Sequence, residues 1–566
     1  MPSTHAEYPA SRVVRRLLIV AVLLFCGILI GFFSNLHTTI ADSSTGGAAW
    51  PMQLFHNVLH GRPLQSSLYA SLLAGLSVGF SHNPHAYIHA FVVHVNLTPY
   101  LLAPLWNLHP TLWWLYALVL LVNYVGWSYF AWKILRLLSP ASAASKTALA
   151  IALLLSSGFF FTLQQKAQLL LFSGPLILAA YDSLLRRRPG WFLASIGLLC
   201  LISEDAAVLA GTFALYLILF EPAYRKPAAW AGALSLGYLA VLLFIVQPAA
   251  RAELTLLAPT NMEFVLRHVT LANVKDLPIQ LLPAWGFLPA FAIAILLFGR
   301  PTIRLRQLAG LLVVAPLAHW GEIVLVSAGH HLMPVISCLF LALILVLGSC
   351  PDVPTSSRLL SRRQIVTGLL CTGLFILLTL RAVATNMPAQ IRPAAYRLAG
   401  KPEAARALEQ QAKEIASNRR VLDVIRTIPP DRSLVFLINS SLEGFIAGRS
   451  DLWKFPDYYD VADFLVVQRD ARHAFFAFTP SPGLALPTVI RQGHVDLFDA
   501  TSVTDGMVQA LIEGLVHRAK THRIRRDGPH VVVLERLTRH PAVVPPTTVG
   551  FGWMRNFPKL WKRQTT

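Results

Sequence analysis

Acidic residues that interrupt apolar segments are the residues of this chain most able to do chemistry. Glu204 and Asp205 are adjacent between two apolar runs, and Glu322 lies near the end of another. Three histidines close to apolar segments accompany them: His94, His330 and His331. Carboxylates in or beside hydrocarbon are costly unless they are paired or used, so this set is a candidate site.

Each candidate also has a plain structural interpretation. Glu204 and Asp205 can form the polar N-terminal turn of a helix over 206–220, where acids are favoured. His94 can be an interfacial histidine bonded to a neighbour, and Glu322 can pair with a nearby histidine. Asp182, four residues before Arg186, is typical of an ion pair at a helix end.

The composition is that of a membrane protein. Apolar residues make up 55% and charged residues 13% of the 566 residues, whereas a soluble domain carries roughly 25% charged residues. The net charge of +20 does not indicate nucleic-acid binding, because no reader motif is present and the basic residues lie largely in short loops. No P-loop or nucleophile elbow is present, so ATP hydrolysis and serine-hydrolase chemistry have no support.

About 11 apolar segments have lengths that suit a hydrocarbon core of about 30 Å, although several are short. They are 17–33, 112–132, 148–163, 169–185, 191–202, 206–220, 229–246, 282–298, 308–326, 332–347 and 365–380. The first segment follows a basic stretch and lacks a clear cleavage site. We therefore expect an uncleaved helix rather than a signal peptide.

The basic residues predict the orientation. The predicted cytoplasmic segments carry 17 of them: Arg12, Arg15, Arg16, Lys133, Arg136, Lys146, Arg186, Arg187, Arg188, Arg225, Lys226, Arg300, Arg304, Arg306, Arg358, Arg362 and Arg363. The longer outer loops carry five: Arg62, Lys166, Arg251, Arg267 and Lys275. This asymmetry predicts a cytoplasmic N-terminus and an extracytoplasmic C-terminal region, in the cell (inner) membrane.

Changes in composition divide the chain. Residues 1–385 read as the transmembrane domain with a long first outer loop at 34–110, and 386–400 as a linker. Residues 401–540 read as a soluble domain and 541–566 as a basic, aromatic tail. Within the soluble domain we expect helices at 403–425 and 505–519, strands at 433–438 and 462–467, and a hairpin at 523–536 that turns at Asp527 and Gly528. This alternation predicts an extracytoplasmic α/β domain.

Several motifs, taken in order, resemble domain-of-unknown-function family 2079, a bacterial family of multi-pass membrane proteins related to the GT-C glycosyltransferases. The first is the run from Gln53 through Asn57 to Gly61, and the next is Val93-His94-Val95 with Pro99. Ser203-Glu204-Asp205-Ala206-Ala207 is similar to a K-E-D-A-A turn of the family. The segments 282–289, 428–430, 455–456, 462–463 and 533–536, with Arg449, follow in the same order.

The resemblance implies a GT-C-like fold and a polyprenyl-phosphate sugar donor for modification of a cell-envelope glycan or lipid. Such transfer needs a base at the acceptor and a cation at the departing phosphate. His94, Glu204 and Asp205 are the candidate catalytic residues. The candidate substrate-binding residues are Gln53, Asn57, Arg62, Arg267, Glu322, His330 and His331. No cofactor is identified, although a divalent metal ion is compatible with the carboxylates. The expected partners are membrane lipid and the lipid-linked sugar, without nucleic acid.

The sequence also departs from the family pattern. Members usually carry an aspartate about six residues before the glutamine of the first motif, and the matching residue here is Gly47. Ser203 replaces the lysine of the K-E-D turn. The alternative function is therefore that of a non-enzymatic membrane protein, such as a lipid or polymer transporter or an envelope scaffold.

Overall fold

The computed structural model forms two compact units. The helical unit comprises Met1–Phe32, Tyr116–Leu242 and Val265–Met387, and the mixed unit comprises Phe33–Leu115, Leu243–Phe264 and Pro388–Thr566. The structure describes residues 9–38, 45–62, 65–68, 88–89, 97–156, 169–246, 287–325, 332–351, 391–438, 442–449, 451–454, 462–469, 471, 503 and 505–538. The predicted span 365–380 and the tail 541–566 lie outside these residues.

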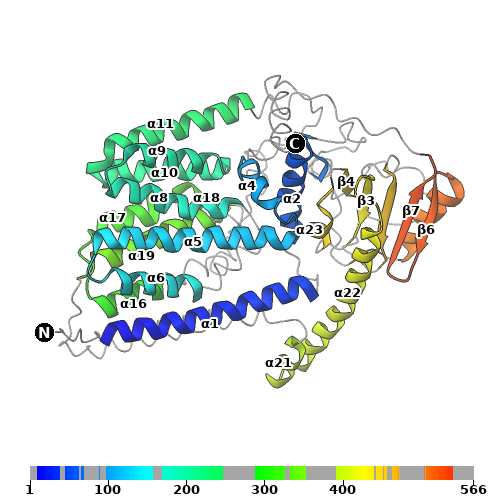
Figure 1. Cartoon of the computed structure of the whole chain (residues 1–566), viewed down its shortest axis with the longest axis horizontal. Helices are drawn as coiled ribbons and strands as arrows, with labels where there is room; N and C mark the ends of the chain where they lie inside the picture. Colours follow the sequence, from blue (N-terminus) through cyan, green and yellow to red (C-terminus); the bar gives the residue numbers. More distant parts are fainter. Residues whose placement is uncertain are drawn as a thin grey trace. The chain divides into compact units, whose positions relative to one another are not determined.

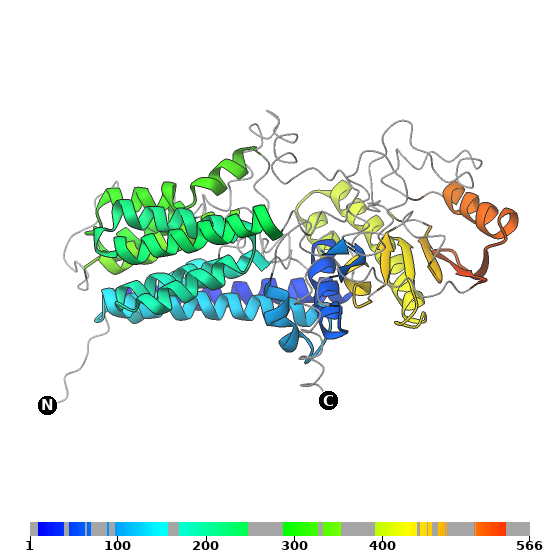
Figure 2. The same ribbon diagram turned by 90° about the horizontal axis from the view of Figure 1, so that it is seen from above.

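The helical unit is a bundle of antiparallel helices (Figures 1 and 2). Two helices belong to it in part: α1 (Pro9–Thr38) up to Phe32 and α5 (Leu112–Leu138) from Tyr116 onwards. Its other helices are α6 (Ala143–Ser156), α8 (Ser173–Leu185), α9 (Pro189–Cys200), α10 (Glu204–Phe220), α11 (Arg225–Val241), α16 (Phe287–Phe298), α17 (Leu305–Ala309), α18 (Leu317–Leu325) and α19 (Leu332–Ser349). A π-helical turn, Gly310–Val314, follows α17 directly and leads to α18. Another, Leu242–Val246, continues α11.

Within the described residues, four helices are long and apolar enough to cross a membrane. They are Val14–Phe33, Leu112–Leu138, Pro222–Val246 and Leu332–Ser349. Shorter apolar helices lie at Ala143–Leu155, Pro189–Cys200, Pro289–Phe298 and Leu305–Val314. Each of these helices overlaps one of the apolar segments of the sequence.

Helix α19 forms the centre of the bundle. Nearly every residue from Leu332 to Gly348 is buried, and the helix packs against α8 and α16. The Trp127 ring of α5 lies 4.8 Å from the Phe340 ring of α19. Gly174 makes this packing possible, because a Cβ atom there would lie 1.9 Å from the Trp127 ring. An apolar helix that is buried all round belongs in the interior of a bundle.

The mixed unit contains a five-stranded sheet of order β4-β3-β5-β7-β6. Strand β3 (Leu434–Leu437) pairs in parallel with both β4 (Leu452–Lys454) and β5 (Phe464–Gln468). Strand β7 (Val531–Arg536) pairs antiparallel with β5 and with β6 (His522–Asp527). The residues of β3 and β5 are all buried, as expected of apolar strands covered on both faces. The strands predicted at 433–438 and 462–467 are confirmed and pair with each other, and the predicted hairpin is confirmed.

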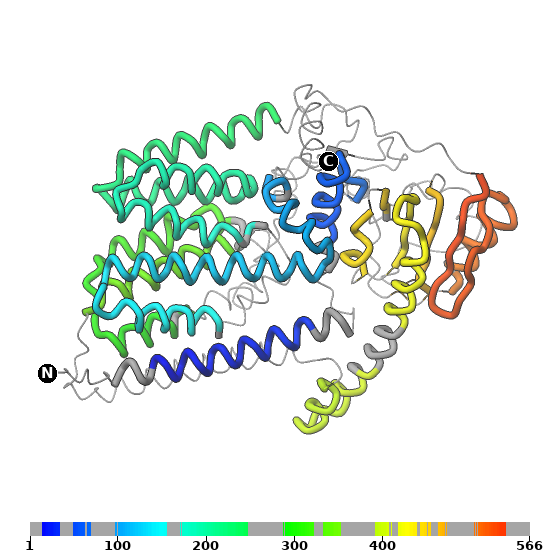
Figure 3. Tube along the Cα trace, viewed as in Figure 1, coloured from blue at the N-terminus to red at the C-terminus, as the bar shows by residue number. Residues whose placement is uncertain are grey.

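Further helices and part of the segment 34–110 complete the mixed unit (Figure 3). The long helix α22 (Pro402–Arg426) confirms the helix predicted at 403–425. It follows α21 (Arg392–Leu398), while α23 (Glu443–Ile446) follows β3 and α25 (Asp505–Ile512) precedes β6. The segment 34–110 contributes α2 (Thr45–Leu59), α4 (Thr98–Trp106) and two short paired strands, β1 (Gln65–Ser66) and β2 (Ile88–His89). Helix α2 packs against α23 and α4.

Candidate functional site

The turn between α9 and α10 holds the acidic pair. Ser203 has an extended backbone, and its hydroxyl accepts a hydrogen bond of 3.2 Å from the amide of Ala206. Glu204 and Asp205 occupy the first turn of α10. Glu204 is 8% exposed and Asp205 is half-buried. The N-cap geometry agrees with the helix-cap interpretation, while the burial of Glu204 places a carboxylate away from bulk water.

Helix α11 lines one side of this turn. The Ser235 hydroxyl donates a 2.5 Å hydrogen bond to the carbonyl of Ala207, which holds the two helices together at this level. Tyr238 lies close enough to Glu204 for an electrostatic interaction. Its hydroxyl oxygen is buried and has no hydrogen-bond partner among the described residues. Polar groups from α10 and α11 therefore meet at one end of the bundle.

A contact deeper in the bundle sets the level of Glu322. The Thr212 hydroxyl donates a 2.5 Å hydrogen bond to the carbonyl of Ala315, which joins α10 to the antiparallel segment leading into α18. Glu322 lies seven residues beyond Ala315, and Asp205 lies seven residues before Thr212. At 1.5 Å per residue both are displaced about 10 Å in the same direction. Asp205 and Glu322 thus lie at a similar level along the bundle.

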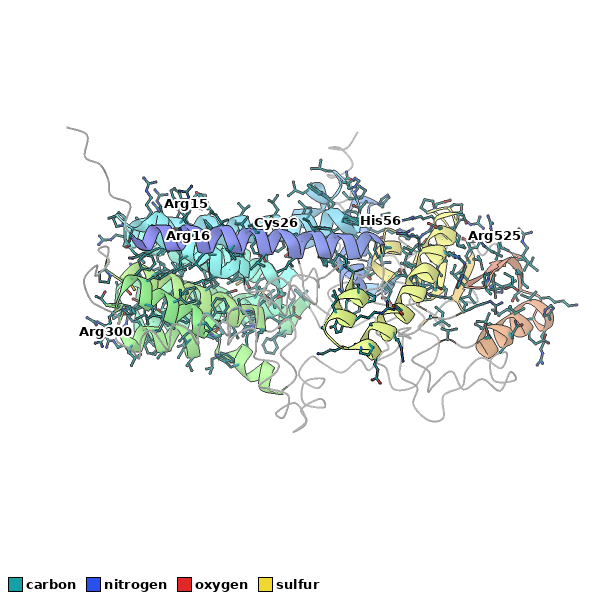
Figure 4. All side chains as sticks on the ribbon, turned by 90° about the horizontal axis from the view of Figure 1, so that it is seen from below. Arg15, Arg16, Cys26, His56, Arg300 and Arg525 are labelled. Carbon is teal, nitrogen blue, oxygen red and sulfur yellow. The ribbon has the colours of Figure 1, made fainter. Side chains whose placement is uncertain are left out.

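Basic residues gather at the opposite end of the helical unit. Figure 4 shows Arg15, Arg16 and Arg300 at this end. The Lys146 ammonium is fully buried and donates to the carbonyl of Cys350, 2.8 Å away. The length of α10 separates this end from Glu204 by about 25 Å. The two ends of the bundle therefore differ in charge.

Two acidic residues at the basic end have clear partners. Asp182 accepts from Arg186 at 2.9 Å and from Lys133 at 3.0 Å, which confirms the predicted helix-end pair. Glu221, directly after α10, accepts from the Tyr216 hydroxyl at 3.1 Å and the Gln307 amide at 3.2 Å. Glu221 is not among the site residues predicted from the sequence. An acid among the basic residues of a predicted cytoplasmic loop is the signal that points to it.

Gln53 of the first motif is a fully satisfied buried amide. Its Nε2 donates to the Ser67 hydroxyl at 2.7 Å and to the carbonyl of Arg449 at 3.3 Å. Its Oε1 accepts from the Ser66 hydroxyl at 2.8 Å and from the amide of Leu68 at 3.1 Å. Gln53 is completely buried, and a glutamine amide has two donors and two acceptor positions. All of its hydrogen-bonding capacity is therefore used inside the protein.

Polar residues near Gln53 in the chain join the α2–β1 segment to the sheet. The Ser67 hydroxyl donates to the carbonyl of Leu452 at 2.7 Å and accepts from the amide of Leu452 at 3.2 Å. Arg62 forms an ion pair of 2.6 Å with Asp451. Asn57 is fully buried and donates from Nδ2 to the carbonyl of Gln65 at 2.7 Å. The polar residues of the first motif thus bind this segment to the beginning of β4.

Arg449 closes the end of α22. Its guanidinium donates to the carbonyls of Ile425, Ile428 and Pro429 at 3.2, 2.6 and 2.7 Å. Ile425 belongs to the last turn of α22, and Ile428 and Pro429 follow the helix. Burial lowers the pKa of Arg449, and the charge of Asp431 opposes this effect. Arg449 therefore has a structural role, and the order of motifs along the chain did not indicate it.

Several predicted site residues are not described. His94, Arg267, His330 and His331 lie outside the described residues. The two histidines come directly before Leu332, where α19 begins. The backbone of Glu322 belongs to α18, and Gly47 belongs to α2.

The acidic pair does not form a metal site by itself. Consecutive side chains on a helix point about 100° apart, so Glu204 and Asp205 do not converge on one ion. In the part of the chain that the structure describes, no three His, Cys, Asp or Glu side chains gather in a way that could hold a metal ion.

The chain has two similarities to known proteins. The chain is similar to the crystal structure of ArnT from Cupriavidus metallidurans bound to undecaprenyl phosphate, with a TM-score of 0.48 and 13% identity. That similarity covers 94% of this chain and 99% of that one. No curated protein matches the sequence. The model of a predicted membrane protein family, DUF2079, matches residues 49–471, which is well over half of the chain. The protein therefore belongs to the DUF2079 family of membrane proteins.

Proposed function

We propose that this membrane protein transfers a sugar from a polyprenyl-phosphate donor to a cell-envelope acceptor, in the manner of GT-C glycosyltransferases. The observation that carries the proposal is the acidic turn at Glu204 and Asp205. It lies at one end of the helical unit, opposite the basic end. Glu204 has little exposure, so its carboxylate carries a desolvation cost, and the N-cap of the helix is provided by Ser203. The donor and the acceptor class come from the family resemblance of the sequence motifs.

The proposed chemistry divides between two kinds of group. A carboxylate of the turn accepts the proton of the acceptor hydroxyl as the new glycosidic bond forms, with His94 as the alternative base. The bond between the sugar and the phosphate breaks at the same time, and the phosphate leaves on the lipid. A cationic side chain is needed to stabilise the charge of that phosphate, and Arg267 is the candidate. Arg62 is already paired with Asp451, so we assign it to the docking of the first outer loop.

The proposal includes a topology. The basic end of the helical unit faces the cytoplasm, and the acidic turn and the five-stranded sheet are extracytoplasmic, in a chain that crosses the inner membrane about 11 times. Positive charge on short loops favours this orientation. Reporter fusions at Ser139, Pro189 and Thr302 should report the cytoplasm, and fusions after Pro388 should report the far side. A cytoplasmic signal after Pro388 would contradict both the topology and the proposed site.

The function is tested with the intact protein in vesicles. A lipid extract of bacterial envelope supplies glycosylated polyprenyl phosphates of every kind, and mass spectrometry follows their conversion to free polyprenyl phosphate. We expect conversion by the wild-type protein and its loss in Asp205→Asn or Glu204→Gln. Glu221→Gln is the matched control, because it also neutralises an acid at an end of α10 and keeps acceptors for Gln307. Equal conversion by all four proteins, or by none, would argue against the transferase.

A non-enzymatic membrane protein is the second candidate. The observation that favours it is the N-cap at Ser203, since acids in the first helical turn are stabilising without any chemistry. The presence of Gly47 where the family usually has an aspartate points the same way. This candidate predicts that the purified protein leaves glycosylated polyprenyl phosphates unchanged, and that substitutions at Glu204 and Asp205 change stability alone.

A further inference from the structure

Strand β6 forms one edge of the five-stranded sheet and is rich in positive charge. All of its residues after His522 are exposed. From residue 517 to residue 526 the chain has no acidic residue and carries five cationic ones: Arg518, Lys520, Arg523, Arg525 and Arg526. Arg525 is labelled in Figure 4. Nothing in the proposed transfer reaction uses these residues.

A β-bulge brings three of the arginines to one face of the sheet. Arg523 pairs with Glu535 of β7, and the register then shifts by one residue, so that Arg526 pairs with Val533. Glu535 and Val533 are two residues apart on β7, so they share a face, and residues paired directly across two strands share it too. The extra residue of the bulge, Arg525, also reaches the Glu535 carboxylate. In a strand without the bulge, alternation would send Arg526 to the opposite face.

Two of these guanidinium groups are held in place without being neutralised. Arg523 donates from Nε and Nη2 to Oε2 of Glu535, at 3.1 and 2.8 Å. Arg525 lies 3.4 Å from Oε1 of the same carboxylate, and its guanidinium carbon lies 5.3 Å from the centre of the Phe464 ring. The two arginine side chains are 63% and 44% exposed. One carboxylate therefore orients two guanidinium groups, each with five N–H donors, and leaves a net positive charge open to solvent.

The acidic residues next to the strand are engaged with other cations. Asp527 forms an ion pair of 2.6 Å with Arg469, and Glu513 forms one of 3.1 Å with Arg518. Arg526 is exposed and has no ion-pair partner in the part of the chain that the structure describes. The positive charge of β6 is therefore largely uncompensated within this unit.

Lys520 adds a cation at the start of the strand, in a backbone conformation that favours glycine. Its φ is 51°. The amides on either side, of Ala519 and Thr521, donate to the carbonyls of Gly514 and Leu515 at 2.9 and 3.0 Å, as at the end of a helix. A residue with a side chain is strained at such a position, which glycine adopts without cost. Lys520 is exposed, and no carboxylate pairs with it among the described residues.

The β6 edge is unsuited to a further strand. Charged side chains and bulges are features that keep an edge strand from pairing with another chain. If a second copy of this protein paired along β6, arginines would lie opposite arginines, which is destabilising. The ligand of this edge is therefore one that meets the side chains rather than the backbone.

The surroundings of β6 also distinguish it from a membrane-binding surface. Such a surface combines cations with aromatic and large apolar side chains. Residues 517–526 contain no aromatic residue and one large apolar residue, Ile524. The opposite edge, β4, is bonded to the α2–β1 segment, which lies in the sequence between α1 and α5, two helices able to cross a membrane. Within the sheet, β6 is the strand farthest from that segment.

We infer that the β6 edge binds an anionic glycan, a polymer that carries carboxylate or phosphate groups along an extended chain. Guanidinium groups form paired hydrogen bonds with carboxylate and phosphate oxygens. The six residues of β6 span about 20 Å at about 3.3 Å per residue, which is the length of several sugar units. An extended polymer meets several of these cations at once, so individually weak contacts add up. The inference does not depend on the proposed transferase function.

The test uses the full-length protein in detergent and a fluorescently labelled oligogalacturonate, a carboxylated glycan long enough to span β6. Fluorescence anisotropy follows its binding. We expect saturable binding that weakens as salt is added, because exposed ion pairs are screened. A neutral maltooligosaccharide of the same length should not compete. Binding should weaken by about tenfold or more in a triple variant of the strand, Arg523→Gln with Arg525→Gln and Arg526→Gln.

A second triple variant is the matched control. It removes the same charge from exposed positions of α22 in the same unit, by Arg406→Gln with Arg419→Gln and Arg426→Gln, and should bind as the wild type does. Lys520→Gly removes one cation and relieves the strained turn, so it should weaken binding while the melting temperature rises. This variant carries the test if the β6 triple variant does not fold.

Three results would overturn the inference. The first is unchanged affinity in the β6 triple variant or in Lys520→Gly, and the second is an equal loss in the α22 triple variant, which would indicate attraction to net charge alone. The third is displacement of the probe by soluble short-chain phosphatidylglycerol at a lower concentration than by unlabelled oligogalacturonate. That result would identify a surface for lipid head groups instead.

Discussion

The α2–β1 segment of the mixed unit and the α9–α10 turn of the helical unit both match motifs of the family, but they differ in how their polar atoms are used. In the first, both donors and both acceptor positions of Gln53 are occupied by protein. In the second, Glu204 is nearly buried at a helix end that Ser203 already caps. The four hydrogen bonds of Gln53 give its burial a structural explanation. The nearly buried carboxylate of Glu204 is the feature on which the proposed function rests.

The largest effect that this comparison predicts is a loss of stability from a substitution in the α2–β1 segment. Gln53→Leu removes four hydrogen bonds, with the Ser66 and Ser67 hydroxyls, the Leu68 amide and the carbonyl of Arg449. Each unsatisfied buried group costs about 1–3 kcal/mol, so we expect a loss of about 3–5 kcal/mol in unfolding free energy. Thermal and denaturant unfolding would measure it. The control is Gln509→Ala, which changes an exposed glutamine of the same unit and should shift stability by less than about 0.5 kcal/mol.

A somewhat smaller loss is expected at Arg449. Lysine keeps the charge but places its donors on one nitrogen, which cannot serve the carbonyls of Ile425, Ile428 and Pro429 in the same geometry. We expect Arg449→Lys to cost about 2 kcal/mol. Hydrogen exchange should show the effect concentrated in the last turn of α22. Stability equal to the wild type would mean that these carbonyls find other donors.

Ser203→Ala separates the helix cap from the acidic residues. It removes the hydroxyl that accepts from Ala206 and leaves both acids in place. Loss of an N-cap costs about 1 kcal/mol. We expect this loss in thermal unfolding with sugar transfer retained. Abolished transfer in a folded Ser203→Ala protein would show that the hydroxyl itself takes part in the reaction.

The last expected effect is a dependence of stability on pH at His56. Its pKa in the folded protein is lowered from 6.5 to about 4 by burial and by His60, Arg62 and Arg449. The unfolded chain therefore binds a proton first as pH falls, so this contribution to stability is complete above pH 6.5 and is lost towards pH 4. Melting temperatures of wild type and His56→Gln should converge across that window. Parallel curves would show that His56 titrates normally.

Much of the architecture followed from local patterns. The apolar run 434–437 and the Asp527-Gly528 turn were sufficient to predict β3 and the hairpin, because strand and turn preferences are local. The partners of Gln53 were not predictable, since the Arg449 carbonyl lies 396 residues away in sequence. Likewise, the level shared by Asp205 and Glu322 depends on the contact between Thr212 and Ala315, 103 residues apart. Such long-range pairings depend on how the elements pack, which no local spacing encodes.

The most direct test of the central claim compares Asp205→Asn with Ser203→Ala in the same vesicle assay. Asparagine preserves the shape of the side chain and removes its charge, whereas Ser203→Ala weakens the cap and keeps the charge. If the acidic turn is a catalytic site, Asp205→Asn abolishes conversion of glycosylated polyprenyl phosphate with little change in melting temperature, and Ser203→Ala lowers the melting temperature and retains conversion. If Asp205→Asn converts the lipid at the wild-type rate, the turn is a helix cap and the account is contradicted.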